Sequence, residues 1–347
     1  MKRFLAFLMT LCMLATLTAC GGSSDSDQSG GEQSSQETGK PEYEWTLAHH
    51  LAEASQQHKG FVKFADDVYE KSGGRIKINI SFGAALGSQR ELIEQVNLGT
   101  IEMALSEASL LANYSKAFGL ICAPFTFLDE DQYIDVASNV INDDLNTLLT
   151  AKSNLRNIAW LYGGTRDVYS TKTMTSLDDL QGLKIRTPES PAFVEGFTAL
   201  GANPTAIAAN EMYTSIQQGV VEAMEGSLET AYTYKIYEVA KNCLRTSHIL
   251  AGCNLVMNNN LYESLPDDLK AIITECAAEM VAYEGQLVAE TDSEYYTMLE
   301  DEGVIFTDLS EEDRARAVEM TAGFVDSYID GDAEMQAIYD KIAEATA

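Results

Sequence analysis

The segment Lys184-Ile185-Arg186-Thr187-Pro188-Glu189-Ser190-Pro191 joins a short strand pattern to the start of a helix. Ser190 and Pro191 open that helix, because proline is common at the first helical position, and its apolar residues recur until Gly201. Arg186 is therefore expected beside free N–H groups of a helix start. An arginine fork pairs with a carboxylate and a helix start carries a partial positive charge, so the segment predicts an anion-binding seat. A surface ion pair of Arg186 is the alternative.

The same alternation of strand and helix recurs along the chain. Residues 57–71 carry apolar side chains on one helical face, whereas residues 75–82 alternate as a half-exposed strand does. Ser88 and Glu91 match a capping box at the start of the next helix, and Gly99 closes it. Further strand patterns cover 45–49, 101–105 and 159–162, and helical periodicity covers 131–150. The alternation predicts an α/β fold with parallel sheets that bind ligands at strand ends.

Residues 266–302 predict one unusually long helix. Their apolar side chains recur at intervals of three and four, and no proline follows Pro266 in this range. At 1.5 Å per residue the helix would be about 50 Å long, which exceeds the roughly 35 to 40 Å width of a 150-residue lobe. We therefore expect it to span two lobes. Gly285 leaves two stacked helices as the alternative.

The first residues predict export and anchoring. Lys2 and Arg3 precede an apolar run over 4–17, which is shorter than the roughly 20 residues that a membrane span needs, so residues 1–19 read as a signal peptide. The run ends in Leu17-Thr18-Ala19-Cys20, which resembles the lipobox of bacterial lipoproteins, where the cysteine is lipidated. An ordinary secretory signal is the alternative. Residues 20–41 are rich in Gly, Ser, Gln and Glu, as in a flexible tether.

Length and charge restrict the partners. About 300 residues follow the tether, which is enough for one large or two medium domains with an ample core. The formal net charge of the 347-residue chain is -30. Such a chain repels nucleic acid and anionic lipid headgroups. The net charge does not exclude a small anion as the ligand. Charges farther away than about 8 to 10 Å are screened, so a buried arginine determines the electrostatic potential in its own cleft.

The cysteines indicate little chemistry. Of the four in the predicted folded part, Cys243 and Cys253 flank a strand-like stretch and are the least strained choice for a disulfide in an exported protein. Buried free thiols are the equal alternative, for these two and for Cys122 and Cys276. No Cys-x-x-Cys pair is present, which argues against a zinc knuckle or a dithiol redox site.

Catalytic motifs are absent from the sequence. It contains no Gly-x-Ser-x-Gly elbow, His-Glu-x-x-His helix or Gly-x-Gly-x-x-Gly turn, and the acid pair Asp143-Asp144 lies in a solvated helical pattern. His49, His50 and His58 leave a metal site as a weaker alternative. We expect no enzyme, no catalytic residue, no metal and no cofactor.

Eight ordered segments between residues 45 and 282 resemble the solute receptors of tripartite ATP-independent periplasmic (TRAP) transporters, of the dicarboxylate-receptor type. The segments are Ala48-His49, 73–76, Leu86-Gly87 with Arg90-Glu91-Leu92, 98–104, 182–186, 200–204, 211–217 and 237–239. The resemblance implies a periplasmic-binding-protein clamshell of two α/β lobes tied by the long helix. Lobe I would comprise 42–163 plus 252–291, and lobe II 164–251 plus 292–347.

The resemblance also implies ligand-binding residues, position by position. Arg186 corresponds to the arginine that clamps the ligand carboxylate with two prongs, and Arg166 to a second arginine used for the same anion. Glu107 corresponds to an acid that contacts hydroxyl or amino groups. Three further residues are implied to lie at or near the cleft: His49, His50 and Gln89.

Two departures from the family pattern bear on the ligand. Gly226 follows Glu225 where the family commonly has an asparagine that holds the ligand, and Ala209 replaces a common aromatic residue. These changes predict a larger or differently oriented ligand, or water in the gap. Glu107 and Glu225 would favour hydroxyls or an amine over a second carboxylate.

These expectations define a function. The chain is expected to be an extracytoplasmic receptor, lipid-anchored at Cys20, that captures a small organic acid such as a hydroxy, keto or sugar acid. Its lobes would close on the ligand and deliver it to the membrane subunits of a TRAP-type transporter. A receptor for a sensor kinase and a receptor for ATP-driven uptake are the alternatives.

Overall fold

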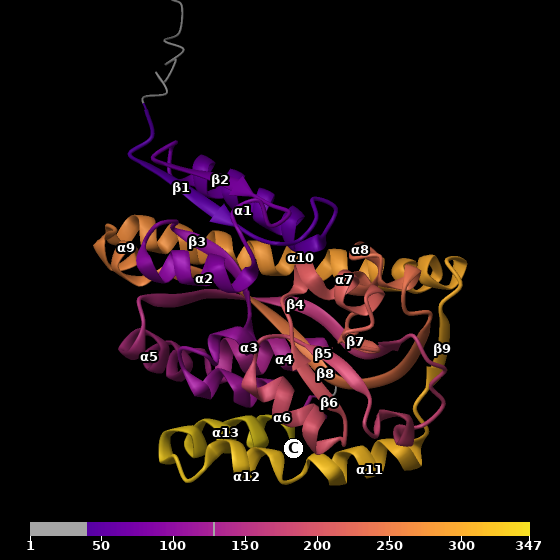
Figure 1. Ribbon diagram of the computed structural model, residues 1–347. Coiled ribbons are helices and arrows are strands. Elements are labelled where there is room, and N and C mark those ends of the chain that lie inside the picture. The colour runs from indigo at the N-terminus through magenta and orange to yellow at the C-terminus, as the bar shows by residue number, and fades with distance from the viewer. Residues whose placement is uncertain (1–39, 128) are drawn as a thin grey trace, which may run out of the picture. The chain divides into compact units, whose positions relative to one another are not determined.

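The computed structural model describes residues 40–127 and 129–347 (Figure 1). The predicted signal peptide over 1–19, Cys20 and all but the last two residues of the tether lie outside the described residues. None of the helices in the described ranges is long and apolar enough to cross a membrane.

The described strands form one sheet in the order β2-β1-β3-β8-β4-β7-β5-β6, with β9 paired to β8. Two groups of parallel strands, β1 with β2 and β3, and β5 with β6 and β7, flank two long antiparallel strands. The strands are β1 (Tyr43–Ala48), β2 (Ile76–Ser81), β3 (Met103–Glu107), β4 (Leu155–Ser170), β5 (Lys184–Thr187), β6 (Asn203–Ala206), β7 (Ala223–Gly226), β8 (Asn242–Asn258) and β9 (Ile305–Asp308). The predicted α/β alternation with parallel strands is therefore confirmed.

One strand prediction was too short. The pattern over 159–162 is part of β4, which runs from Leu155 to Ser170 and pairs with β8 along its length. Register shifts interrupt this pairing around Gly163-Gly164 and again after Arg166. Such irregularities and buried polar residues break the alternation of apolar and polar side chains. The alternating pattern in the sequence therefore ends before the strand does.

Helix starts follow the predicted caps. The Ser88 side chain accepts from the backbone N–H of Glu91, whose carboxylate accepts from the backbone of Ser88, and Gly99 ends this helix with a φ of 74°. The helices are α1 (Gln56–Lys71), α2 (Gln89–Leu98), α3 (Ala108–Leu111), α4 (Glu130–Asp135), α5 (Asn142–Lys152), α6 (Pro191–Ala199), α7 (Met212–Gln217), α8 (Leu228–Thr233), α9 (Asn259–Ser264), α10 (Asp267–Asp301), α11 (Glu311–Thr321), α12 (Phe324–Ile329) and α13 (Ala333–Thr346), with short 3-10 turns at 116–122, 177–180, 209–211 and 236–238 and a π-helical turn at 136–140.

The long helix is confirmed as one element. α10 contains 35 residues and continues through Gly285 without a break. A Cβ atom added at Gly285 would lie 2.6 Å from Cε2 of Tyr162 on β4. The glycine therefore lets the Tyr162 ring pack closely against the helix and does not interrupt it.

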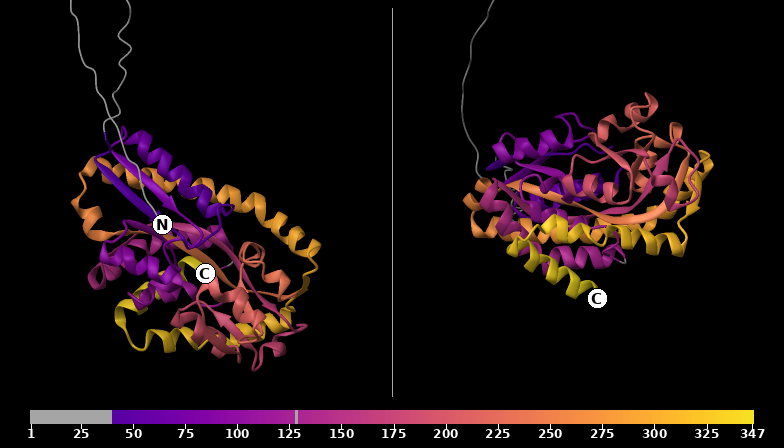
Figure 2. Two further views of the ribbon diagram at one scale, coloured as in Figure 1. Left: turned by 45° about the horizontal axis from the view of Figure 1, so that its top comes forward. Right: turned by 60° about the horizontal axis from the view of Figure 1, so that its bottom comes forward.

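α10 shares a core with each group of parallel strands. Leu269 and Ile273 in its first half pack in the cluster that contains Phe61 of α1 and residues of β1 to β3. Leu299 near its end packs in a different cluster, with Met212 of α7 and Met224 of β7. Figures 1 and 2 show α10 running beside α1 and on to α8. The helix thus joins both halves of the sheet, while the exact lobe boundaries stay a prediction.

Of the two alternatives left open for Cys243 and Cys253, the structure shows free thiols and not a disulfide. Both residues are buried and free, and both lie on the continuous strand β8. At about 3.3 Å per residue they are on the order of 30 Å apart, whereas a disulfide needs Cα atoms within about 7 Å. The sequence showed a strand-like stretch between them but not that one strand contains both.

We predict that Gly285→Ala lowers stability. This change in a helix interior usually stabilises by about 1 kcal/mol, but here the new methyl would overlap the Tyr162 ring, and overpacking typically costs about 1 to 3 kcal/mol. Gly60→Ala is the control, because Gly60 also lies inside a helix, α1, and its added Cβ would lie no closer than 3.4 Å to the side chains of α10. Thermal unfolding followed by circular dichroism measures both; a higher melting temperature for Gly285→Ala would contradict the packing argument.

Candidate functional site

Arg186 projects from β5 as a buried cation. Its Nε donates a hydrogen bond of 2.8 Å to the carbonyl oxygen of Ile207, which fixes the guanidinium plane. Its Nη1 lies 3.9 Å from Oε1 of Glu225, beyond hydrogen-bond distance. Because the side chain is buried, the alternative of a surface ion pair does not apply. The Nη1 and Nη2 atoms form an end-on fork that suits the two oxygens of a carboxylate.

Arg166 on β4 is already paired. Its Nε and Nη2 donate to Oε2 and Oε1 of Glu225 on β7, at 2.5 and 2.7 Å. Both side chains are buried, Glu225 completely. Burial alone would raise the pKa of Glu225, but the charge of Arg166 and the hydrogen bonds of His248 and Arg166 together outweigh it and lower this pKa to about 2. His248 on β8 lies on the same carboxylate, with Nε2 at 3.5 Å from Oε2.

This pairing changes the role expected of Arg166. Two of its donor nitrogens face Glu225, and the third, Nη1, lies 3.9 Å from Oε1 of Glu107. The ion pair therefore neutralises most of the charge of Arg166. Arg186 is left as the cation with a free fork.

Four of the predicted ligand residues line one cleft. His50, Glu107, Arg166 and Arg186 converge there from strands or strand ends in both halves of the sheet. The space among the lining residues is about 510 Å³ with the open solvent at its mouth included, and the part that admits the centre of a water molecule is about 30 Å³. Among the described residues, none of α6 lines the cleft, so the free N–H groups expected beside Arg186 do not contribute to its wall.

Four other predicted residues do not line the cleft. His49 turns into the core, where its Nε2 lies 3.0 Å from Nδ1 of His58 and burial lowers its pKa to about 3. Gln89 is buried in the first turn of α2. Glu225 lies beneath the arginines, and a Cβ on Gly226 would meet the Thr230 side chain at 3.2 Å. These four positions lie outside the lining of the cleft, and their predicted contacts with a ligand stay predictions.

The histidines do not gather around a common point. His49 pairs with His58, and His50 stacks on the ring of Tyr234 with 6.5 Å between centroids. Across residues 40–127 and 129–347, no group of three or more His, Cys, Asp or Glu side chains is placed to hold a metal ion.

Three buried polar atoms of residues that line the cleft have no hydrogen-bond partner among the described residues. They are Nδ1 of His50, Oε1 of Gln57 and the hydroxyl of Tyr234. Burial, followed by the charge of Arg186, lowers the pKa of His50 to about 4, so its ring is neutral at pH 7. Buried polar groups normally have partners, and a bound polar ligand would supply them here.

Several lining residues were missed from the sequence. They are Gln57, Ser227, Glu229, Thr230, Tyr234 and Cys253. Ser227 to Tyr234 directly follow the end of β7, so the rule that ligands bind at strand ends could have found them. Gln57 carries no such signal, because it lies in the first turn of α1 and reaches the cleft through the fold.

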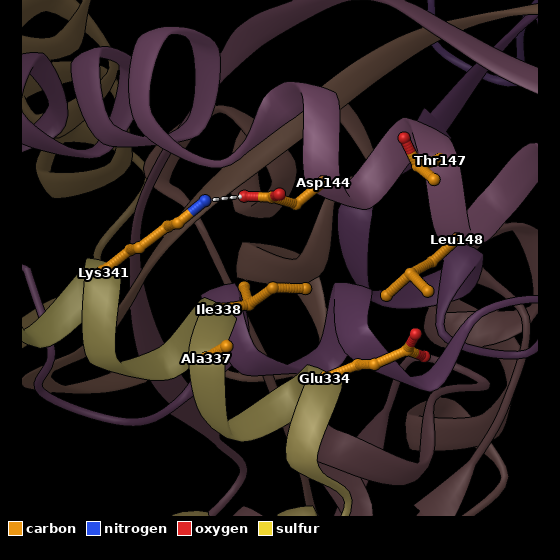
Figure 3. Close-up of a pocket in the computed structure, with 7 residues that line it drawn as sticks. All are labelled: Asp144, Thr147, Leu148, Glu334, Ala337, Ile338 and Lys341. Atoms are coloured by element: carbon orange, nitrogen blue, oxygen red, sulfur yellow. Dashed lines mark hydrogen bonds and ion pairs between the residues drawn. The ribbon is translucent and has the colours of Figure 1, made fainter.

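A second hollow lies between α5 and α13 and is not the candidate site. Figure 3 shows Asp144 and Leu148 of α5 facing Ile338 and Lys341 of α13. The Lys341 ammonium is held by Asp144 at 2.5 Å, and none of the predicted ligand residues lies there. The cleft at Arg186 therefore remains the candidate.

Comparison with known proteins decides the family. The family described as "Bacterial extracellular solute-binding protein, family 7", or DctP, matches residues 47–331. The chain belongs to this family. The expected identity as a TRAP solute receptor of the dicarboxylate-receptor type is confirmed, and with it the two-lobed fold and an extracytoplasmic place of action. The protein is a receptor and not an enzyme, and a receptor for ATP-driven uptake is not favoured.

Three similarities are specific. A solute-binding protein of Roseobacter denitrificans is 30% identical over 263 residues, which cover 76% of this chain and 81% of that protein. The 2,3-diketo-L-gulonate-binding periplasmic protein of Escherichia coli is 29% identical over 265 residues, which cover 76% and 80%. A crystal structure of the same Roseobacter denitrificans protein with bound L-galactonate superposes with a TM-score of 0.79 at 27% identity, covering 88% of this chain and 99% of that one.

We predict that Glu284→Gln stabilises the protein more at pH 8 than at pH 5. Glu284 of α10 is fully buried, and burial raises its pKa well above the ordinary 4.5. The folded state therefore keeps a proton that the unfolded chain releases, and stability falls as the pH rises above about 4.5. Glutamine does not titrate, so Glu284→Gln removes this decrease in stability with rising pH. The amide group of the glutamine loses one of the two hydrogen bonds that Glu284 accepts, but this cost is the same at both pH values. We therefore expect Glu284→Gln to be more favourable at pH 8 than at pH 5.

Urea unfolding at both pH values measures the effect. Glu319→Gln, an exposed position on α11, is the matched control and should change stability equally at pH 5 and pH 8. A gain from Glu284→Gln that does not depend on pH would show that the buried carboxyl is not protonated on folding.

Proposed function

We propose that this receptor captures a sugar acid with one carboxylate and delivers it to the membrane subunits of a TRAP transporter. The observation that carries the proposal is the difference between the two buried arginines. Arg166 is neutralised by Glu225, while Arg186 keeps a free end-on fork in the same cleft. One free fork suits one carboxylate.

The remaining cleft residues suit the rest of such a ligand. The His50 ring and the Tyr234 hydroxyl are buried polar groups that need partners, and Glu107 offers acceptor oxygens for hydroxyl groups. Closure of the lobes around the ligand would exclude water, which strengthens the arginine–carboxylate pair and stabilises the closed state. The closed receptor would then dock on the transporter.

The relatives support the same class of ligand. The Roseobacter denitrificans structure contains L-galactonate, and the Escherichia coli relative binds 2,3-diketo-L-gulonate. Each of these ligands carries hydroxyl groups and one carboxylate. Among the expected hydroxy, keto and sugar acids, we therefore propose sugar acids as the ligands.

We also propose that the receptor is anchored by a lipid on Cys20. The support is the Leu17-Thr18-Ala19-Cys20 pattern after an apolar run, followed by the polar segment over 20–41. A tethered receptor stays near the transporter in the membrane, which raises its effective concentration there.

The ligand class predicts a specific binding profile. In isothermal titration calorimetry, L-galactonate or another hexonate or hexuronate should bind, whereas galactitol, which has the hydroxyls without the carboxylate, should not. Arg186→Lys keeps the charge but loses the fork, so affinity should fall by roughly 30- to 5,000-fold, the range for breaking a buried charged pair. Equal binding of galactitol, or a loss below threefold in Arg186→Lys, would refute the proposal.

The anchor predicts a change of compartment. Cys20→Ser should prevent lipid attachment, because serine has no thiol to acylate, and should move the receptor from the detergent phase to the aqueous phase in Triton X-114 partitioning. Cys12→Ser, which lies inside the predicted signal peptide, is the matched control and should keep the protein in the detergent phase. An unmodified wild-type N-terminus in mass spectrometry would rule the anchor out.

A further inference from the structure

We propose that Gln57 and Glu229 form an acceptor wall in the cleft that selects a hydrogen-bond donor on the ligand, a hydroxyl or an ammonium group, and rejects a second carboxylate. The inference rests on the proposed function, because Arg186 must first hold one carboxylate. It assigns specificity to two residues that line the cleft but were not expected there.

The orientation of the Gln57 amide is fixed. Its Nε2 donates to the carbonyl oxygen of Tyr162 at 2.9 Å and to Oε1 of Glu284 at 3.3 Å. Turning the amide over would place its oxygen against the carbonyl oxygen of Tyr162, which can only accept a hydrogen bond. Gln57 is only 3% exposed, and its Oε1 is buried without a partner among the described residues. The cleft therefore contains a preset acceptor that a ligand donor would satisfy.

Glu284 of α10 supports this orientation of the Gln57 amide. Its Oε2 accepts from the backbone N–H of Tyr162 at 3.1 Å, so the same residue of β4 engages both Gln57 and Glu284. A Cβ on Gly60 would lie 3.4 Å from Cβ of Glu284, which shows how closely α1 packs on α10 at this point. The Gln57 side chain cannot shift without disturbing two helices and a strand.

Glu229 adds a carboxylate to the same wall. It lies in the first turn of α8, is half-buried and lines the cleft together with Gln57. The neighbouring Gln56 amide, in its better-satisfied orientation, donates to both oxygens of Glu229 and thereby ties α8 to the start of α1. A second ligand carboxylate here would face like charge and acceptor oxygens.

The charges of the cleft lead to the same conclusion. Arg166 and Arg186 are the cations among the described residues that line it. Glu225 offsets Arg166, and the single carboxylate of a sugar acid offsets Arg186. A diacid would bring a second negative charge, and no cation among the described lining residues would be left to pair with it. Glu107 and Glu229 already add two negative charges to the same cleft.

A matched ligand pair tests the wall. L-galactonate and galactarate differ only at C6, where one has a hydroxymethyl group and the other a carboxylate. In calorimetry with the purified receptor we expect L-galactonate to bind at least 100-fold tighter than galactarate. Glu229→Gln should reduce this ratio at least tenfold, because it removes the charge and keeps the shape. Gln57→Met, which removes the buried acceptor, should weaken L-galactonate about tenfold, and Glu319→Gln should leave the ratio unchanged.

The outcomes separate the two proposals. Galactarate binding as tightly as L-galactonate to the wild type, or an unchanged ratio in Glu229→Gln, would overturn the acceptor wall and leave the sugar-acid receptor standing. Binding of neither ligand nor of any hexonate or hexuronate would overturn the proposed function, and the wall with it.

Discussion

The structure of the cleft depends on the buried ion pair between Arg166 and Glu225. It joins neighbouring strands β4 and β7 with two short hydrogen bonds, and His248 of β8 lies against the same carboxylate. Taking two charges out of water is unfavourable unless they pair well, and removing either partner would leave an uncompensated charge. The pair stabilises little by itself, but it sets the electrostatics above it. Because Glu225 neutralises Arg166, Arg186 is the remaining cation among the described residues that line the cleft.

The long helix α10 connects this electrostatic centre to the rest of the molecule. Its first half packs in the core that contains β1, β2 and β3, and its end packs in the cluster that contains Met224 of β7. Between them, Gly285 admits the Tyr162 ring and Glu284 holds Gln57 at the cleft. If α10 bends or slides when the lobes close, its residue Glu284 moves while it is hydrogen-bonded to Gln57, which lines the cleft. Ligand binding and lobe movement can be coupled through these contacts without a separate relay.

The sequence predicted the features that local signals encode. The Ser88 capping box, the Gly99 stop and the 35-residue α10 follow from the spacing of neighbouring residues, and all are found. Arg186 was predicted as an anion-binding residue because it lies on a strand pattern that is followed by a proline and a helix start. The extent of β4 was missed, since Gly163-Gly164 and the buried polar residues after it interrupt the alternation.

Contacts between distant segments were beyond the reach of the sequence. Nothing local shows that Glu225 lies against Arg166, 59 positions away, or that Gln57 reaches Glu284, 227 positions away. A crystal structure of the receptor with L-galactonate is the most direct test of the role of Arg186. We predict that the carboxylate lies on the Nη1 and Nη2 atoms of Arg186 while Glu225 stays paired with Arg166. A carboxylate bound in place of Glu225 on Arg166, with Arg186 free, would contradict it.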